Sequence, residues 1–91
     1  MIEITEVNIK PLNNEHSKVI GLASIVIGGC FEVHDFRIVN ADKGRFIGMP
    51  SKKAKNGEGF MDLAHPLNVD TREYLTKMIL EAYDEKVNAK S

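Results

Sequence analysis

Residues 18–27 (KVIGLASIVI) most constrain the fold, because they are apolar at both odd and even positions. Successive side chains of a β-strand point to opposite faces of its sheet, so this pattern indicates a strand that is covered on both faces. We expect a helix on one face and another subunit or a second layer on the other. Gly28 and Gly29 follow, and two glycines favour a tight hairpin turn because glycine tolerates positive φ.

The stretches 2–12 and 30–39 also alternate apolar and polar residues, but in each the apolar positions change parity partway along. A strand whose buried face changes parity contains a β-bulge, which we place near Thr5 in the first stretch and at His34 and Asp35 in the second. The second bulge is expected to bring an imidazole and a carboxylate together. No serine or cysteine nucleophile stands in a suitable setting beside them, so we expect a structural or supporting polar role rather than catalysis.

The C-terminal stretch predicts one long helix. Asp70 and Glu73 have the spacing of a capping box. Apolar residues then recur at helical spacing, namely Leu75, Met78, Ile79, Ala82 and Tyr83. Strands followed by a helix predict an α+β fold, with a four- or five-stranded antiparallel sheet and a C-terminal helix packed on it.

A chain of 91 residues forms a single domain, here residues 1–91, with a small core. We therefore expect a homodimer that forms through strands. The only cysteine, Cys30, cannot form an intramolecular disulfide, and we expect it to be buried.

Glu3 and Glu6 stand where a signal peptide carries basic residues, and no run approaches the roughly 18 apolar residues of a membrane span. We expect a cytoplasmic protein that is not inserted in a membrane.

Charge is distributed unevenly, although the net charge is only -1. Residues 1–36 carry two basic and five acidic residues, residues 37–55 carry six basic and one acidic, and residues 56–91 carry four basic and seven acidic. The middle of the chain is therefore a basic segment between acidic flanks. This distribution is more informative about anionic partners than the net charge is.

Residues 44–55 (GRFIGMPSKKAK) carry this basic segment out of the sheet. Phe46 and Gly48 are expected on one face of a strand and Arg45, Ile47 and Met49 on the other, and Pro50 ends the ladder because it has no N–H to donate. Lysines follow at Lys52, Lys53 and Lys55, beside the hydroxyl of Ser51. This pattern is typical either of a solvated loop or of a loop that contacts phosphates.

Other chemistry has weaker support in the sequence. Arg72 lies in the first turn of the predicted helix, where it could hold an anion together with backbone N–H groups. His16, in an expected turn over residues 13–17, and His34 and His65 lie far apart without partners at ligand spacing, so no metal site or other cofactor is expected.

Three stretches in this order, FEVHDFRI (31–38), GRFIGMPSKK (44–53) and DLAHPLN (62–68), followed by Thr71 and Arg72, closely resemble the stage V sporulation protein G (SpoVG) family over nearly the whole chain. That family consists of small bacterial proteins with an antiparallel sheet and a C-terminal helix, usually dimeric, linked to septation and sporulation, and several bind DNA or RNA. The resemblance implies a bacterial regulator without catalysis. The residues after the lysines, 54–56, lack the proline and the acidic residue of the family pattern.

Two functions remain open. In the first, a regulator binds DNA or RNA, with phosphate contacts from Arg45, Ser51, Lys52, Lys53, Lys55 and Arg72. In the second, the chain is a protein-interaction module of the septation machinery, and its basic loop docks an acidic partner without direct nucleic-acid binding.

Overall fold

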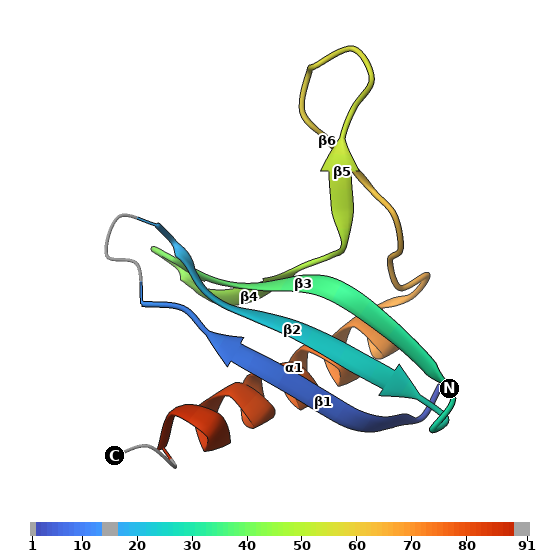
Figure 1. Cartoon of the computed structure of the whole chain (residues 1–91), viewed down its shortest axis with the longest axis vertical. Coiled ribbons are helices and arrows are strands. Elements are labelled where there is room, and N and C mark those ends of the chain that lie inside the picture. The colour runs from blue at the N-terminus through green and yellow to red at the C-terminus, as the bar shows by residue number, and fades with distance from the viewer. Residues whose placement is uncertain (1, 14–16, 89–91) are drawn as a thin grey trace.

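Six strands and one helix make up the computed structural model, which describes residues 2–13 and 17–88 (Figure 1). The elements are β1 (Ile4–Pro11), β2 (Val19–Ile27), β3 (Phe31–Ala41), β4 (Gly44–Gly48), β5 (Ser51–Lys53), β6 (Phe60–Asp62) and α1 (Val69–Asn88). The first four strands form an antiparallel sheet in the order β1-β2-β3-β4, and β5 pairs with β6 in a separate sheet. The predicted α+β fold is therefore confirmed. Residues 14–16 of the predicted turn, including His16, lie outside the described residues.

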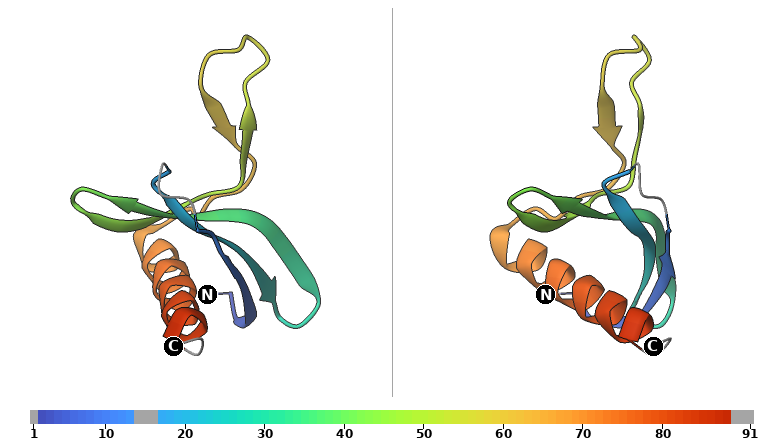
Figure 2. Two further views of the ribbon diagram at one scale, coloured as in Figure 1. Left: turned by 60° about the vertical axis from the view of Figure 1, so that its left-hand side comes forward. Right: turned by 90° about the vertical axis from the view of Figure 1, so that its left-hand side faces the viewer.

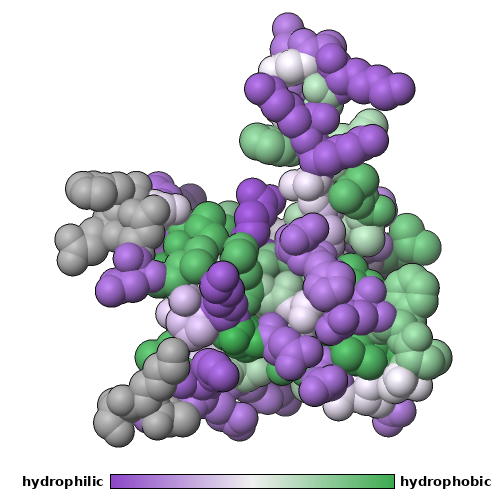
Figure 3. Space-filling view, viewed as in Figure 1, coloured by the Kyte–Doolittle hydropathy of each residue, from purple (hydrophilic) through white to green (hydrophobic). Residues whose placement is uncertain are grey.

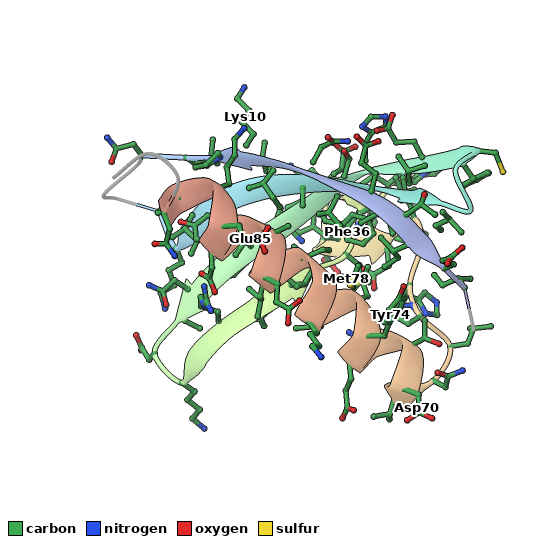
Figure 4. The ribbon with its side chains drawn as sticks, turned by 90° about the horizontal axis from the view of Figure 1, so that it is seen from below. Lys10, Phe36, Asp70, Tyr74, Met78 and Glu85 are labelled. Carbon is green, nitrogen blue, oxygen red and sulfur yellow. The ribbon has the colours of Figure 1, made fainter. Side chains whose placement is uncertain are left out.

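Helix α1 lies across one face of the four-stranded sheet (Figures 1 and 2). The buried apolar residues of this layer are Ile4, Ala23, Ile25, Phe36, Ile38, Ile47 and Met49 from the sheet side and Leu75 and Ile79 from the helix. Phe36, Tyr74 and Met78 point into the space between the two layers (Figure 4). The predicted apolar stripe of the helix thus faces the core.

The opposite face of the sheet is not covered by any described part of the chain. On β2, buried Ala23 alternates with Leu22, which is 37% exposed, and on β4, buried Ile47 alternates with Phe46, which is 50% exposed. The sequence predicted another subunit or a second layer of the chain over this face of β2. The described residues do not form such a second layer. Cover by another subunit, the other expectation for this face, stays a prediction.

Both predicted bulges are present. The register of β1 against β2 shifts between Ile4 and Glu6. In β3, two residues oppose one residue of β2 at positions 34 and 35, and Asp35 has a φ of 73°. His34 contacts Glu32 on its own strand, with 3.2 Å between Nε2 and Oε1, rather than the neighbouring Asp35, so the predicted imidazole–carboxylate pair has a different carboxylate.

Two local predictions are wrong. Cys30 is exposed in the turn between β2 and β3, because the tight turn at Gly28 and Gly29, both with positive φ, takes it out of the strand. The N-terminal cap of α1 is Asn68 rather than Asp70, since the backbone N–H of Thr71 donates to Asn68 Oδ1 at 2.8 Å. Asparagine caps as well as aspartate does, and the helix therefore begins at Val69.

Candidate nucleic-acid interface

The C-terminal part of the basic segment, residues 51–53, forms one strand of a hairpin that projects from the body of the molecule (Figures 1 and 2). Strand β4 ends at Gly48, and the buried residues Met49 and Pro50 lead into β5, as the proline predicted. Residues 51–53 were expected in a loop, but they pair with 60–62 in strict antiparallel register. We call residues 50–63 the arm.

Backbone hydrogen bonds fix the arm at its base and its tip. At the base, the N–H of Leu63 donates to the carbonyl of Pro50 at 2.7 Å. At the tip, the N–H of Ala54 donates to the carbonyl of Gly59 at 3.2 Å. Gly57 and Gly59 have φ values of 77° and 75°, which an L-residue other than glycine adopts only at a cost. The backbone of the arm is therefore a closed two-stranded hairpin rather than an irregular loop.

The three lysines of the arm are exposed and make no ion pair or hydrogen bond with any of residues 2–13 and 17–88. Lys52 and Lys53 are consecutive in β5, so their side chains leave opposite faces of the hairpin. Lys55 lies at the tip, while Ser51 is half-buried at the base, opposite Asp62. The surface of the arm is largely hydrophilic (Figure 3). The arm thus offers three cations that form no ion pair within the described residues, beside two carboxylates of its own, Glu58 and Asp62.

Arg72 is exposed in the first turn of α1. The structure gives no hydrogen bond or ion pair between it and the arm within the described chain. Asn68 already accepts from two N–H groups of this turn, from Thr71 at 2.8 Å through its side chain and from Arg72 at 3.2 Å through its carbonyl. The backbone N–H groups of Thr71 and Arg72 are therefore already used, and the first turn of α1 has fewer donors for an anion than the sequence suggested.

Arg45, unlike the lysines of the arm, is bound to a carboxylate of the chain. Its guanidinium binds Asp84 of α1 through two hydrogen bonds, of 2.6 Å from Nη1 and 3.2 Å from Nη2. The hydrogen bond with Arg45 is the main reason that the pKa of Asp84 lies below its usual range, and the same hydrogen bond raises the pKa of Arg45. Asp84 therefore joins α1 to β4, and the charge of Arg45 is offset within the chain.

The Arg45–Asp84 pair predicts a pH dependence. Because the folded-state pKa of Asp84 is depressed, its contribution to stability is present above the unfolded carboxyl pKa of about 3.9 and is lost as the pH falls through the folded value. In an NMR titration of the side-chain carboxyl carbons, we expect Asp84 to titrate below the ordinary aspartate pKa of about 3.9. The substitution Arg45→Ala should raise the Asp84 pKa toward that ordinary value, and an unchanged pKa would contradict the pairing.

The structure also reveals apolar residues that the sequence analysis did not assign to a site. Half of the exposed large hydrophobic residues among the described residues lie between positions 60 and 69. They are Phe60, Met61, Leu63, Leu67 and Val69. A mainly apolar cavity of about 550 Å³ lies between the sheet, the first turns of α1 and residues 64–68. The exposed apolar residues could have been found from the sequence, because five large apolar residues lie within a turn-rich segment. The cavity could not, because it forms only when the sheet and α1 come together.

The described residues do not contain a group of three or more histidine, cysteine or carboxylate side chains that could hold a metal ion. His65 is exposed, with its Nδ1 3.1 Å from the carbonyl oxygen of Pro66. Within the same residues, no helix combines the length and the apolar character that crossing a membrane requires.

Comparison with known proteins gives one consistent family. The SpoVG family model matches residues 2–85. Similar proteins include one from Phytoplasma australiense, 42% identical over 96% of this chain and 88% of its own length, and one from Caldicellulosiruptor bescii, 38% identical over 97% and 98%. A third, from Lachnospira eligens, is 42% identical over 92% of this chain and 93% of its own. All three carry the name "Putative septation protein SpoVG".

Proposed function

The chain belongs to the SpoVG family, and we propose that it is a cytoplasmic, non-catalytic regulator of septation and sporulation that binds DNA or RNA through the arm. The names of its relatives support the septation and sporulation role. Nucleic-acid binding rests on a different observation, the arm itself. It presents three exposed lysines on a projecting hairpin, and none of them forms an ion pair with a carboxylate of residues 2–13 and 17–88.

In this proposal Lys52, Lys53 and Lys55 contact phosphates, Ser51 adds a hydroxyl donor at the base of the arm, and Arg72 adds a further cation. Contacts of this kind position a protein on nucleic acid without reading its sequence. We leave Arg45 out of the contact set because its guanidinium is already bound to Asp84. Removal of Arg45 should therefore alter affinity less than removal of a lysine of the arm.

We propose further that the protein is a homodimer and that the arm takes part in the dimer interface. The sheet β5-β6 has three-residue strands and pairs with no other strand of the described residues, and a two-stranded hairpin of this size is at best marginally stable alone. Phe60 and Met61 are 72% and 52% exposed on it. Two linked arms would strengthen binding through effective concentration.

The direct test measures binding of the purified protein to labelled duplex DNA, single-stranded DNA and RNA at physiological salt. We expect at least one of them to bind more tightly than the non-specific range of about 10⁻⁴ to 10⁻⁶ M. Binding no tighter than that for every probe would refute the nucleic-acid proposal. Sedimentation of the same sample should give twice the chain mass of 10.2 kDa, and a monomer would refute the dimer.

A protein-interaction module of the septation machinery is the second candidate function. The exposed apolar residues between positions 60 and 69 and the apolar cavity beside them favour it, because large exposed apolar groups mark interaction surfaces. In this case the lysines dock an acidic protein partner. Weak binding to all nucleic-acid probes, together with salt-sensitive binding to an acidic septation protein, is the result that would select this function.

A further inference from the structure

The uncovered face of the sheet carries an exposed aromatic ring among aliphatic residues. Phe46 is 50% exposed and lies directly opposite Val39 of β3, and Leu22 of β2 is exposed on the same face. In Figure 3, which looks onto this face, hydrophobic residues lie beside hydrophilic ones. We call Leu22, Val39 and Phe46 the apolar patch. A patch on extended strands is flat enough to accept a planar ring.

Cations flank the apolar patch along one cross-strand row. Lys10 lies opposite Leu22, Leu22 lies opposite Arg37, and Arg37 lies opposite Gly48. The Arg37 side chain extends over Gly48, because a Cβ atom at position 48 would be only 3.0 Å from Arg37 Nη2. Lys10 points away from α1 (Figure 4). With strands about 4.8 Å apart, Lys10 and Arg37 are roughly 10 Å from each other.

A hollow of about 510 Å³ adjoins Phe46 on the side of the β3–β4 turn. Its lining includes Lys18 and Lys43 together with one acidic residue, Asp42. The acidic residues Glu6 and Glu32 of the same face lie opposite Val26, toward the other end of the sheet. Asp35 lies nearer, because it lines a hollow together with Lys10 and Leu22. Among the described residues of this face, Arg37, Lys18 and Lys43 thus gather on the side of Phe46, whereas Glu6 and Glu32 lie toward the other end.

We propose that the apolar patch and its flanking cations bind single-stranded nucleic acid. This inference rests on the proposed function and specifies the form of the ligand. An unpaired base can stack its face on Phe46, whereas a base inside a duplex is already stacked on its neighbours. The neighbouring phosphates then lie against Lys10 and Arg37 on one side and Lys18 and Lys43 on the other.

The position of the patch relative to the arm supports a strand as occupant. Gly48, beneath the Arg37 side chain, is separated from Lys52 of the arm by only three residues. A flexible strand that crosses the sheet can therefore continue onto the arm, along a path that is positive at both ends. A second copy of the chain fits less well, because two such faces in contact would bring the same four cations together.

The test compares single-stranded and duplex probes on the same variant. Phe46→Ala should weaken binding to an oligonucleotide of about 20 deoxythymidines by about 5- to 150-fold, the range for loss of one stacked base. Binding to a duplex of the same length should change less than twofold. Phe46→Tyr should retain wild-type affinity, and Phe46→Leu, which keeps apolar bulk without a ring, should show most of the loss.

Phe31→Ala is the matched control. Phe31 is 63% exposed in β3, lies opposite Ile27 and is outside the apolar patch, so its removal should leave both affinities unchanged. Equal losses for the single strand and the duplex, or none for either, would overturn the inference. If Phe46→Ala changes the oligomeric state that sedimentation shows for the wild type, the inference is overturned and the face is a subunit interface instead. If wild-type protein binds no probe, the proposed function itself fails.

Discussion

Ile79→Ala is expected to lower the free energy of unfolding by about 2 to 5 kcal/mol, the range for removing a large aliphatic side chain from a core. Ile79 is fully buried and lies in the layer between α1 and the sheet. The substitution removes apolar contact area and leaves a cavity that the surrounding strands can fill only in part. In a domain of this size the total stability is about 5 to 15 kcal/mol, so the loss is a large share of it.

Urea unfolding followed by circular dichroism at fixed protein concentration measures this change. The midpoint temperature in a parallel thermal scan should fall by at least about 8 °C, since 1 kcal/mol corresponds to about 4 to 8 °C in a domain of this length. Val87→Ala on the same helix is the matched control, because Val87 is 39% exposed and its truncation should cost less than about 1 kcal/mol. A similar small loss for Ile79→Ala would show that α1 is not packed as described.

Much of the fold could be predicted because its signals are local. Apolar residues on both parities identified the central strand β2, and the parity change in β3 placed a bulge at residues 34 and 35, where Asp35 has positive φ. The two glycines predicted the turn, and Pro50 predicted the end of β4. Each of these features depends on the backbone conformation of a few neighbouring residues.

The parts that were missed depend on contacts between distant residues. Arg45 and Asp84 are 39 positions apart, and only the placement of α1 on the sheet brings them together. Residues 51–53 have no apolar alternation, and their strand exists because residues 60–62 return alongside them. Asn68 and Asp70 are both good caps, so the choice between them was set by the path of the chain before the helix.

Replacing Lys52 and Lys53 together by alanine is expected to weaken nucleic-acid binding by about 30-fold per subunit at 0.15 M salt. Each phosphate contact contributes about fivefold at this salt through release of counterions. Both lysines are exposed and have no described partner within the chain, so folding should be unaffected and the thermal midpoint should stay at the wild-type value. A loss of affinity accompanied by a lower midpoint would not count as support.

Lys77→Ala, alone and combined with Lys86→Ala, is the matched control for charge. These lysines are exposed residues of α1 and not part of the arm, and the double variant likewise removes two positive charges from each subunit. If net charge alone governs affinity, the two double variants should behave alike. If the arm contacts the phosphates, only the Lys52 and Lys53 variant should lose about 30-fold.

The slope of the logarithm of affinity against the logarithm of salt concentration tests most directly whether the arm contacts phosphates. For duplex DNA, we expect the slope of the Lys52→Ala and Lys53→Ala double variant to be shallower than that of the wild type by about 0.9 for each lost contact, or about 1.8 per subunit. A slope equal to that of the wild type would contradict the account, because it would mean that these lysines release no counterions and lie outside the interface.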